Sequence, residues 1–138
     1  MKKIQTGLKG FILFVLAASS LFVTCEIGLG DSVDTKPPTV SVLYPPAVSV
    51  IRGDFVVAGS AADETSLATV LVSMTATSGS DAGLTFGPWS ATIDRAANAW
   101  RATVPAPASD GTYTVTAEAV DNANRKTTTS VSYIIDNT

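Results

Sequence analysis

The side chains best suited to chemistry in this sequence are acids and amides that gather in two short segments. Asp63 and Glu64 follow the run FVVAGSAA, and Asp121 is followed closely by Asn122 and Asn124. Carboxylate and amide oxygens from neighbouring loops are the ligands that Ca²⁺ takes in proteins. The same residue types also close turns by bonding to their own backbone. Asp63 and Asp121 are therefore candidate calcium ligands, with ordinary turn chemistry as the alternative.

The sequence offers little catalytic machinery. It contains no histidine and a single cysteine, Cys25, which rules out Ser-His-Asp and Cys-His catalysis, Cys/His zinc sites and an intrachain disulfide. The acids are scattered over turn segments, and no glycine-rich phosphate loop is present. We expect no enzymatic activity and no cofactor.

The charge distribution also argues against nucleic acid as a partner. Three of the nine basic residues, Lys2, Lys3 and Lys9, fall in the first ten positions, so the remainder carries six basic residues against twelve acidic ones. Binding to phosphate backbones requires clustered Lys and Arg. We expect no nucleic-acid partner.

Two further features could form a binding surface. Arg52-Gly53-Asp54 spells the tripeptide that integrins recognise on exposed loops, although Gly-Asp also serves as an ordinary turn. Trp89 and Trp100 could form a ligand surface if both faced solvent. Trp100 lies inside an alternating run, which favours a place between the sheets of the fold. We expect the tripeptide to be a turn and Trp100 to define the core.

The N-terminal segment is typical of an exported protein. The basic residues precede an uncharged apolar run, FILFVLAASSLFV from Phe11 to Val23, which is the arrangement of a secretory signal. A helix of this length rises about 20 Å and falls short of the roughly 30 Å core of a bilayer.

The end of this run resembles the lipobox of bacterial lipoproteins, in which the cysteine is lipidated and becomes the new N-terminus. It reads LFVTC and ends at Cys25. Phe22 and Thr24 depart from the usual aliphatic and small residues, so ordinary cleavage after Ala17 to Ser20 and an uncleaved anchor are the alternatives. Lipidation is favoured because the only cysteine stands where the apolar run stops.

These features predict three parts: a lipoprotein signal peptide at 1–24, a flexible tether at 25–36 and a folded domain at 37–138. Acyl chains such as palmitate on Cys25 would make the membrane a partner of the protein. We expect a membrane-anchored protein of the bacterial cell envelope, at the outer membrane or the cell surface.

From Thr39 onward, short alternating runs rich in Val and Thr are separated by Gly, Pro, Asp and Ser clusters, which is the pattern of an all-β sandwich. In the clearest run, Tyr113, Val115, Ala117 and Ala119 share one face, which we expect to be buried. Residues 77–88 are expected to form a loop or an irregular edge. The strands are predicted at Thr39 to Tyr44, Phe55 to Ala62, Leu67 to Ala76, Ala99 to Val104, Thr112 to Asp121 and Arg125 to Asp136, with an edge strand at Trp89 to Asp94.

Four pieces of the sequence together resemble the bacterial immunoglobulin-like domains that often occur as tandem repeats in surface proteins. They are DTKPPTV from Asp34, GSAAD from Gly59, DGTY from Asp110 and AVDNAN from Ala119. The resemblance covers about residues 34–138. It implies an antiparallel immunoglobulin-like β-sandwich of about seven strands.

The resemblance also implies roles for individual residues. Tyr113 has the placement of the tyrosine corner, in which the hydroxyl bonds back to the preceding turn. Val115 stands where an antibody domain has its second cysteine, so the chain resembles the disulfide-free members of the fold. The turns that hold Asp63 and Asp121 would lie at the same end of the sandwich, where cadherin-like modules bind calcium.

Taken together, these features predict a non-catalytic, lipid-anchored envelope protein whose domain acts as a structural spacer or an adhesion module. The alternatives are a carbohydrate- or calcium-dependent recognition domain and the N-terminal fragment of a longer multidomain surface protein. The partner of such a module would be a protein or glycan ligand.

Overall fold

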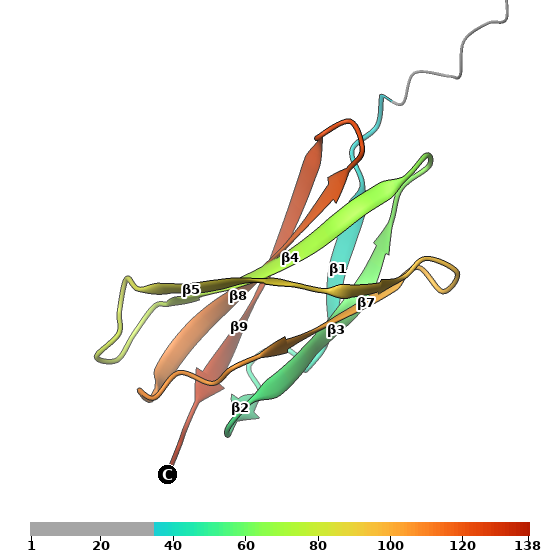
Figure 1. The fold of residues 1–138 in the computed structure, drawn as a ribbon. Helices are drawn as coiled ribbons and strands as arrows, with labels where there is room; N and C mark the ends of the chain where they lie inside the picture. Colours follow the sequence, from blue (N-terminus) through green and yellow to red (C-terminus); the bar gives the residue numbers. More distant parts are fainter. Residues whose placement is uncertain (1–34) are drawn as a thin grey trace, which may run out of the picture. The chain divides into compact units, whose positions relative to one another are not determined.

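The computed structural model describes residues 35–138, which form a sandwich of two β-sheets (Figure 1). No helix in this described part is long and apolar enough to cross a membrane. Cys25, the predicted signal peptide and most of the predicted tether lie outside the described residues. The strands are β1 (Thr39–Tyr44), β2 (Val50–Ile51), β3 (Phe55–Ala62), β4 (Leu67–Ala76), β5 (Thr85–Ser90), β6 (Thr92–Asp94), β7 (Ala99–Val104), β8 (Gly111–Asp121) and β9 (Lys126–Ile135).

The strands divide into a four-stranded sheet of order β1-β3-β7-β6 and a five-stranded sheet of order β2-β9-β8-β4-β5. All neighbouring strands are antiparallel except β2 and β9, which run parallel. The expected all-β, immunoglobulin-like sandwich is confirmed. The two strands beyond the expected seven are short: β2 has two residues and β6 has three.

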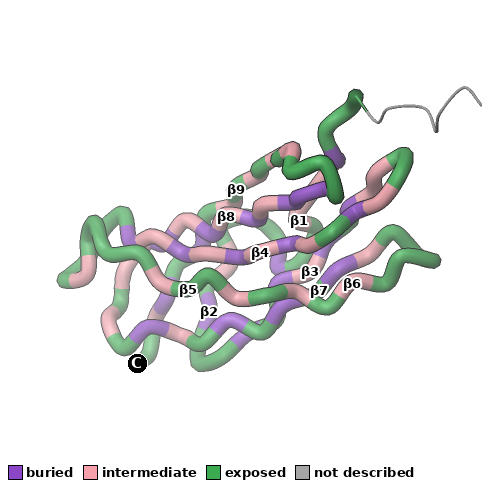
Figure 2. The backbone as a smooth tube through the Cα atoms, turned by 45° about the horizontal axis from the view of Figure 1, so that its top comes forward, coloured by how far each residue is buried: buried purple, intermediate pink, exposed green. Residues whose placement is uncertain are grey.

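The core lies between the sheets and follows the period of two that a strand imposes. In β8, Tyr113, Val115, Ala117 and Ala119 are buried, and the threonines between them are half-buried. Buried and less buried residues alternate along the strands in the same way (Figure 2). Each sheet therefore turns one face to the core and the other to solvent.

The structure corrects the predicted edge strand at Trp89 to Asp94. The stretch is divided between β5, which pairs with β4, and β6, which pairs with β7 in the other sheet. The chain changes sheets at Ala91, whose N–H donates to Val70 O at 2.9 Å. A run shared by two sheets cannot be one strand. β5 begins at Thr85, inside the segment expected to be a loop or an irregular edge, and it forms an edge strand with a register shift.

The two ends of the described chain lie at opposite ends of the sandwich (Figure 1). At the first end, the Lys36 ammonium contacts the Glu64 carboxylate in the β3–β4 turn at 2.6 Å. At the second end, the side-chain amide of Asn137 donates to Pro107 O, Ala108 O and Asp110 Oδ1 in the β7–β8 connection. The chain therefore enters near one pole of the sandwich and leaves near the other.

Candidate functional site

Asp121, the first candidate calcium ligand, is buried at the end of β8. Its Oδ1 accepts from Arg125 N at 2.8 Å, and its Oδ2 accepts from Arg125 Nε at 2.8 Å. Burial alone would raise the pKa of this carboxyl, but the backbone and side-chain hydrogen bonds from Arg125 and its positive charge hold the pKa below the ordinary value. Both carboxylate oxygens are thus engaged within the β8–β9 turn.

Asp63, the second candidate, closes the β3–β4 turn. Its Oδ1 accepts from the backbone N–H groups of Thr65 at 3.0 Å and Ser66 at 2.8 Å. This is the local bonding pattern by which Asp stabilises a turn. The neighbouring acid, Glu64, contacts Lys36.

The two acidic turns lie side by side at one pole. Asn122 Nδ2 donates to Ser66 Oγ at 2.7 Å, and Asn122 N donates to Ser66 O at 3.2 Å. Even so, residues 35–138 contain no group of three acid, cysteine or histidine side chains that could hold a metal ion. Calcium binding by Asp63 and Asp121 stays a prediction.

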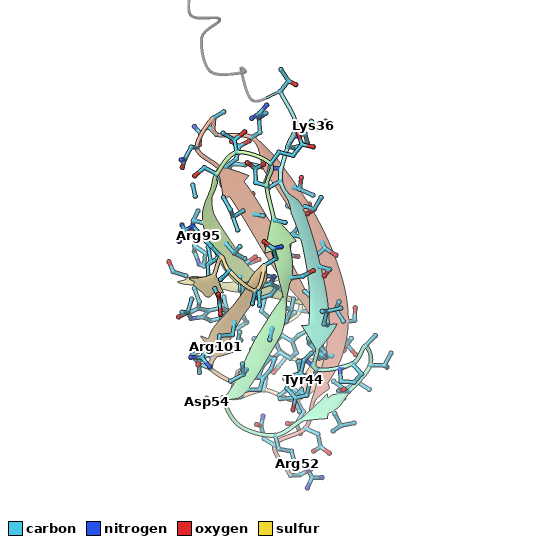
Figure 3. The ribbon with its side chains drawn as sticks, turned by 90° about the vertical axis from the view of Figure 1, so that its right-hand side faces the viewer. Lys36, Tyr44, Arg52, Asp54, Arg95 and Arg101 are labelled. Carbon is cyan, nitrogen blue, oxygen red and sulfur yellow. The ribbon has the colours of Figure 1, made fainter. Side chains whose placement is uncertain are left out.

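Arg52-Gly53-Asp54 connects β2 to β3 at the opposite pole (Figure 3). Gly53 has φ 70°, which suits a turn. Asp54 Oδ1 accepts from Ala106 N at 3.0 Å, and Arg52 Nη2 lies 3.4 Å from Asp136 Oδ2. Both charged side chains thus have partners within the domain, as expected of a structural turn.

Trp100 and Tyr113 each combine a buried ring with one anchored polar atom. Trp100 is 2% exposed, and its Nε1 donates to Ser60 O at 3.1 Å. The Tyr113 hydroxyl donates to Ser109 O at 2.8 Å, which is the tyrosine-corner bond, and lies 3.2 Å from Asp81 Oδ2. Burial, followed by the bond to Asp81 and its charge, raises the pKa of Tyr113. Trp89 is half-buried and packs against the core.

The outer face of the β1-β3-β7-β6 sheet carries a groove that was not among the sites predicted from the sequence. Tyr44 pairs with Ala58, Ala58 with Arg101 and Arg101 with Thr92. Paired residues in antiparallel strands project to the same face, so these four residues form one row, called here the outer-face row. Figure 3 shows Tyr44 at the end of β1 and Arg101 on the far side of β3. No local signal marks this row, because each member comes from a different strand.

Comparisons with known proteins agree with this architecture. A family model described as bacterial Ig-like domain matches residues 52–137, which is more than half of the chain. A search of curated protein sequences finds no match. Among solved structures, an endo-beta-1,4-mannanase from Thermotoga petrophila is 16% identical with a TM-score of 0.54; the match covers 76% of this chain and 21% of that chain. At this identity the likeness extends to the fold alone, and this chain matches about a fifth of that enzyme's length.

Proposed function

Because the chain belongs to the bacterial Ig-like domain family, we propose that it is a non-catalytic module of the bacterial cell envelope. Its sandwich acts as a structural spacer or an adhesion module, and a lipid on Cys25 anchors it to the membrane. The proposal joins the export-type N-terminal segment of the sequence to the geometry of the sandwich.

The observation that carries the spacer role is the placement of the ends. The chain enters the sandwich beside the β3–β4 turn and leaves it beside the β7–β8 connection, at the opposite pole. A domain whose chain enters at one pole and leaves at the other separates the groups attached to its two ends by the full length of the sandwich. If both ends lay at one pole, the domain would hang to one side and add little reach.

The anchor rests on sequence features outside the described residues. The apolar run ends at Val23, and Cys25 follows two positions later, ahead of a polar segment with Gly28 and Gly30. Each buried methylene of an acyl chain contributes about 0.8 kcal/mol to membrane binding, so stable attachment needs more than one chain. Lipidation of Cys25 would supply such chains and leave the Gly-containing segment as a flexible tether.

The test is the intact mass of the mature protein extracted with detergent from bacterial membranes. We expect the mass of residues 25–138 plus a glyceryl group and acyl chains. A Cys25→Ser variant, which keeps the same apolar run, should lack the added mass, because it has no thiol to carry the glyceryl group. An unmodified chain in the soluble fraction of cells that express the natural sequence would overturn the anchor.

A further inference from the structure

The outer-face row sets an aromatic ring opposite a guanidinium across a small residue. Tyr44 and Arg101 are two strands apart in the sheet, with Ala58 between them. Neighbouring strands are about 4.8 Å apart, so the two backbones lie roughly 10 Å from each other. Alanine reaches far less above the sheet than its neighbours. The row therefore forms a slot with Ala58 as its floor.

The next row along the sheet continues this slot. Ser60 pairs with Ala99, and Ala99 pairs with Asp94. Ala99 extends the small floor, and Asp94 stands at the edge that β6 forms. The groove as a whole is an open hollow with a volume of about 740 Å³, which is in the range of small-ligand sites.

Two side chains of the outer-face row, Arg101 and Tyr44, are available to bind a ligand. Arg101 is exposed and makes no hydrogen bond or ion pair with any residue of the described range 35–138. Tyr44 is 60% exposed, so a large part of its ring is open to contact with a ligand. Arg and Tyr are among the residues that most often dominate binding energy at interfaces.

The other groups of the groove are partly committed to the fold. Arg95 Nη2 donates to Leu67 O at 3.1 Å. Asp94 Oδ1 accepts from Ala96 N at 3.0 Å and Ala97 N at 3.1 Å. These bonds fix the turn between β6 and β7, so the charged wall of the groove is held in place before any ligand binds.

The surface continues beyond Arg101 into a second hollow. Arg101 and Thr92 line both hollows, and the second also includes Trp89, Pro88 and Val56. The Arg101 guanidinium thus lies between the hollow that contains the exposed Tyr44 and the hollow that contains the half-buried Trp89. This layout suits an elongated ligand with a negative charge near its middle.

We propose that this outer face binds a carboxylate-bearing saccharide. The Arg101 guanidinium donates a forked pair of hydrogen bonds to the sugar carboxylate, a geometry that arginine matches and lysine does not. The Tyr44 ring packs against the apolar C–H face of a sugar ring. The hydroxyl of Thr92 and the free oxygen of Asp94 bond to sugar hydroxyls. The proposal deepens the adhesion role proposed above by naming the class of partner.

An extended peptide is a poorer fit to this face. Peptides that bind sheets usually add as a strand at an edge, where backbone N–H and C=O groups are free. The groove lies over β3 and β7, whose backbones are already paired on both sides. A ligand there meets mainly side chains. Besides the Tyr44 ring and the polar groups of β6 and β7, these include the apolar Leu43 and Ile93.

The experiment is calorimetric titration of the full chain in detergent with three probes: oligogalacturonate, oligoalginate and sialyllactose. Methyl-esterified oligogalacturonate serves as a probe with the same sugars and no charge. We expect at least one acidic probe to bind, and its neutral counterpart to bind about tenfold more weakly or not at all.

Three variants test the residues. Arg101→Gln and Tyr44→Ala should each weaken binding about tenfold, and Arg101→Lys should recover only part of the loss because it keeps the charge without the fork. Arg52→Gln is the matched control: it removes an exposed arginine outside the groove and should leave binding unchanged. All three positions are exposed, so an unchanged melting temperature checks that each variant folds.

Absence of binding by all three acidic probes, equal binding of the methyl ester, or an equal loss in Arg52→Gln would each overturn the proposal. These results do not depend on the anchor. If the chain carries acyl groups but binds no acidic saccharide, the anchored spacer function stands and the saccharide site is overturned. If the chain is unmodified but binds an acidic saccharide, the saccharide site stands and the anchor is overturned.

Discussion

Buried hydroxyl groups tie the core tyrosines to distant parts of the chain. Tyr113 bonds to Ser109 O in the preceding turn, and Tyr133 donates to Pro45 O at 2.9 Å across 88 positions of sequence. Both rings are fully buried. A buried polar group without a partner is costly, so each hydroxyl fixes the segment that supplies its acceptor.

Tyr113→Phe should destabilise the domain by about 1–2 kcal/mol. The change removes the bond to Ser109 O and leaves that carbonyl without its partner, while the ring stays packed. Chemical denaturation monitored by tryptophan fluorescence measures the loss. Tyr44→Phe is the matched control, because Tyr44 is exposed and its hydroxyl has no partner in the described residues. Equal stability of Tyr113→Phe and the natural sequence would show that the corner bond contributes nothing.

Because of the buried Tyr133 hydroxyl, we expect the stability of the domain to fall at alkaline pH. Burial raises its pKa from 10.0 to about 12. Between these two values the unfolded chain releases the Tyr133 proton and the folded chain retains it, so stability should be unaffected below pH 10 and fall as the pH rises above it. Urea midpoints measured across this range test the slope. A Tyr133→Phe variant should lack this part of the decline, and an unchanged slope in that variant would contradict the assignment.

Asp121 makes the stability of the domain depend on pH in the acid range. Its pKa is lower in the folded chain than its ordinary value of 3.8, so its contribution is present above that value and is lost as the pH falls through the folded pKa. Melting temperature should therefore drop in acid. Asp121→Asn should be less stable than the natural sequence at neutral pH and show a shallower acid decline. If the melting temperature of Asp121→Asn declined as steeply in acid as that of the natural sequence, other carboxylates would be responsible for the acid sensitivity.

At the scale of strands, β1 and β3 approach too closely for a side chain at one position. A Cβ built on Gly59 would meet the backbone oxygen of Ser41 at 1.8 Å and the Trp100 ring at 3.1 Å. Backbone cannot give way as a flexible side chain can. This glycine is therefore required by the pairing of β1 with β3, although its φ is not in the left-handed region.

Gly59→Ala should cost about 3 kcal/mol, at the upper end of the usual range for overpacking. The strand β1 would have to move away from β3 or lose part of its ladder. Thermal unfolding gives the size of the loss. Ser60→Ala, one position along and on the outer face, is the control and should change stability by less than about 1 kcal/mol. A stable Gly59→Ala variant would mean that β1 can shift at no cost.

Strand pairing also explains what the sequence could and could not predict. The long alternating runs β3, β4, β7 and β8 begin and end within one residue of the predicted positions, because alternation and turn residues are local signals. The two-residue strand β2 follows a turn in which Val48 has φ 64° and depends on a distant parallel partner. The outer-face row depends on a bulge at Leu43 and on the register of four strands. Neither feature has a signature in its own segment.

At the scale of the whole molecule, the sandwich holds together without a covalent link. The chain has one cysteine, and that residue lies outside the described part. The core of residues 35–138 consists of apolar side chains from both sheets, with Asp121 as the one buried charged residue in this range. We expect the melting temperature of the full chain to be the same with and without a thiol reductant. A lower value in reductant would reveal an intermolecular disulfide through Cys25.

The parallel pair β2–β9 determines how the module responds to tension. Ile134 N donates to Ser49 O at 3.0 Å, and Asp136 N donates to Ile51 O at 3.1 Å. Pulling the two chain ends apart draws β2 and β9 in opposite directions along their length, so these bonds bear the load together in shear. Pulling instead at residues 121 and 126 opens the β8–β9 ladder one bond at a time. Single-molecule stretching should therefore give a higher rupture force for the first geometry, and a module stretched between a cell and an attached surface would resist extension rather than unzip.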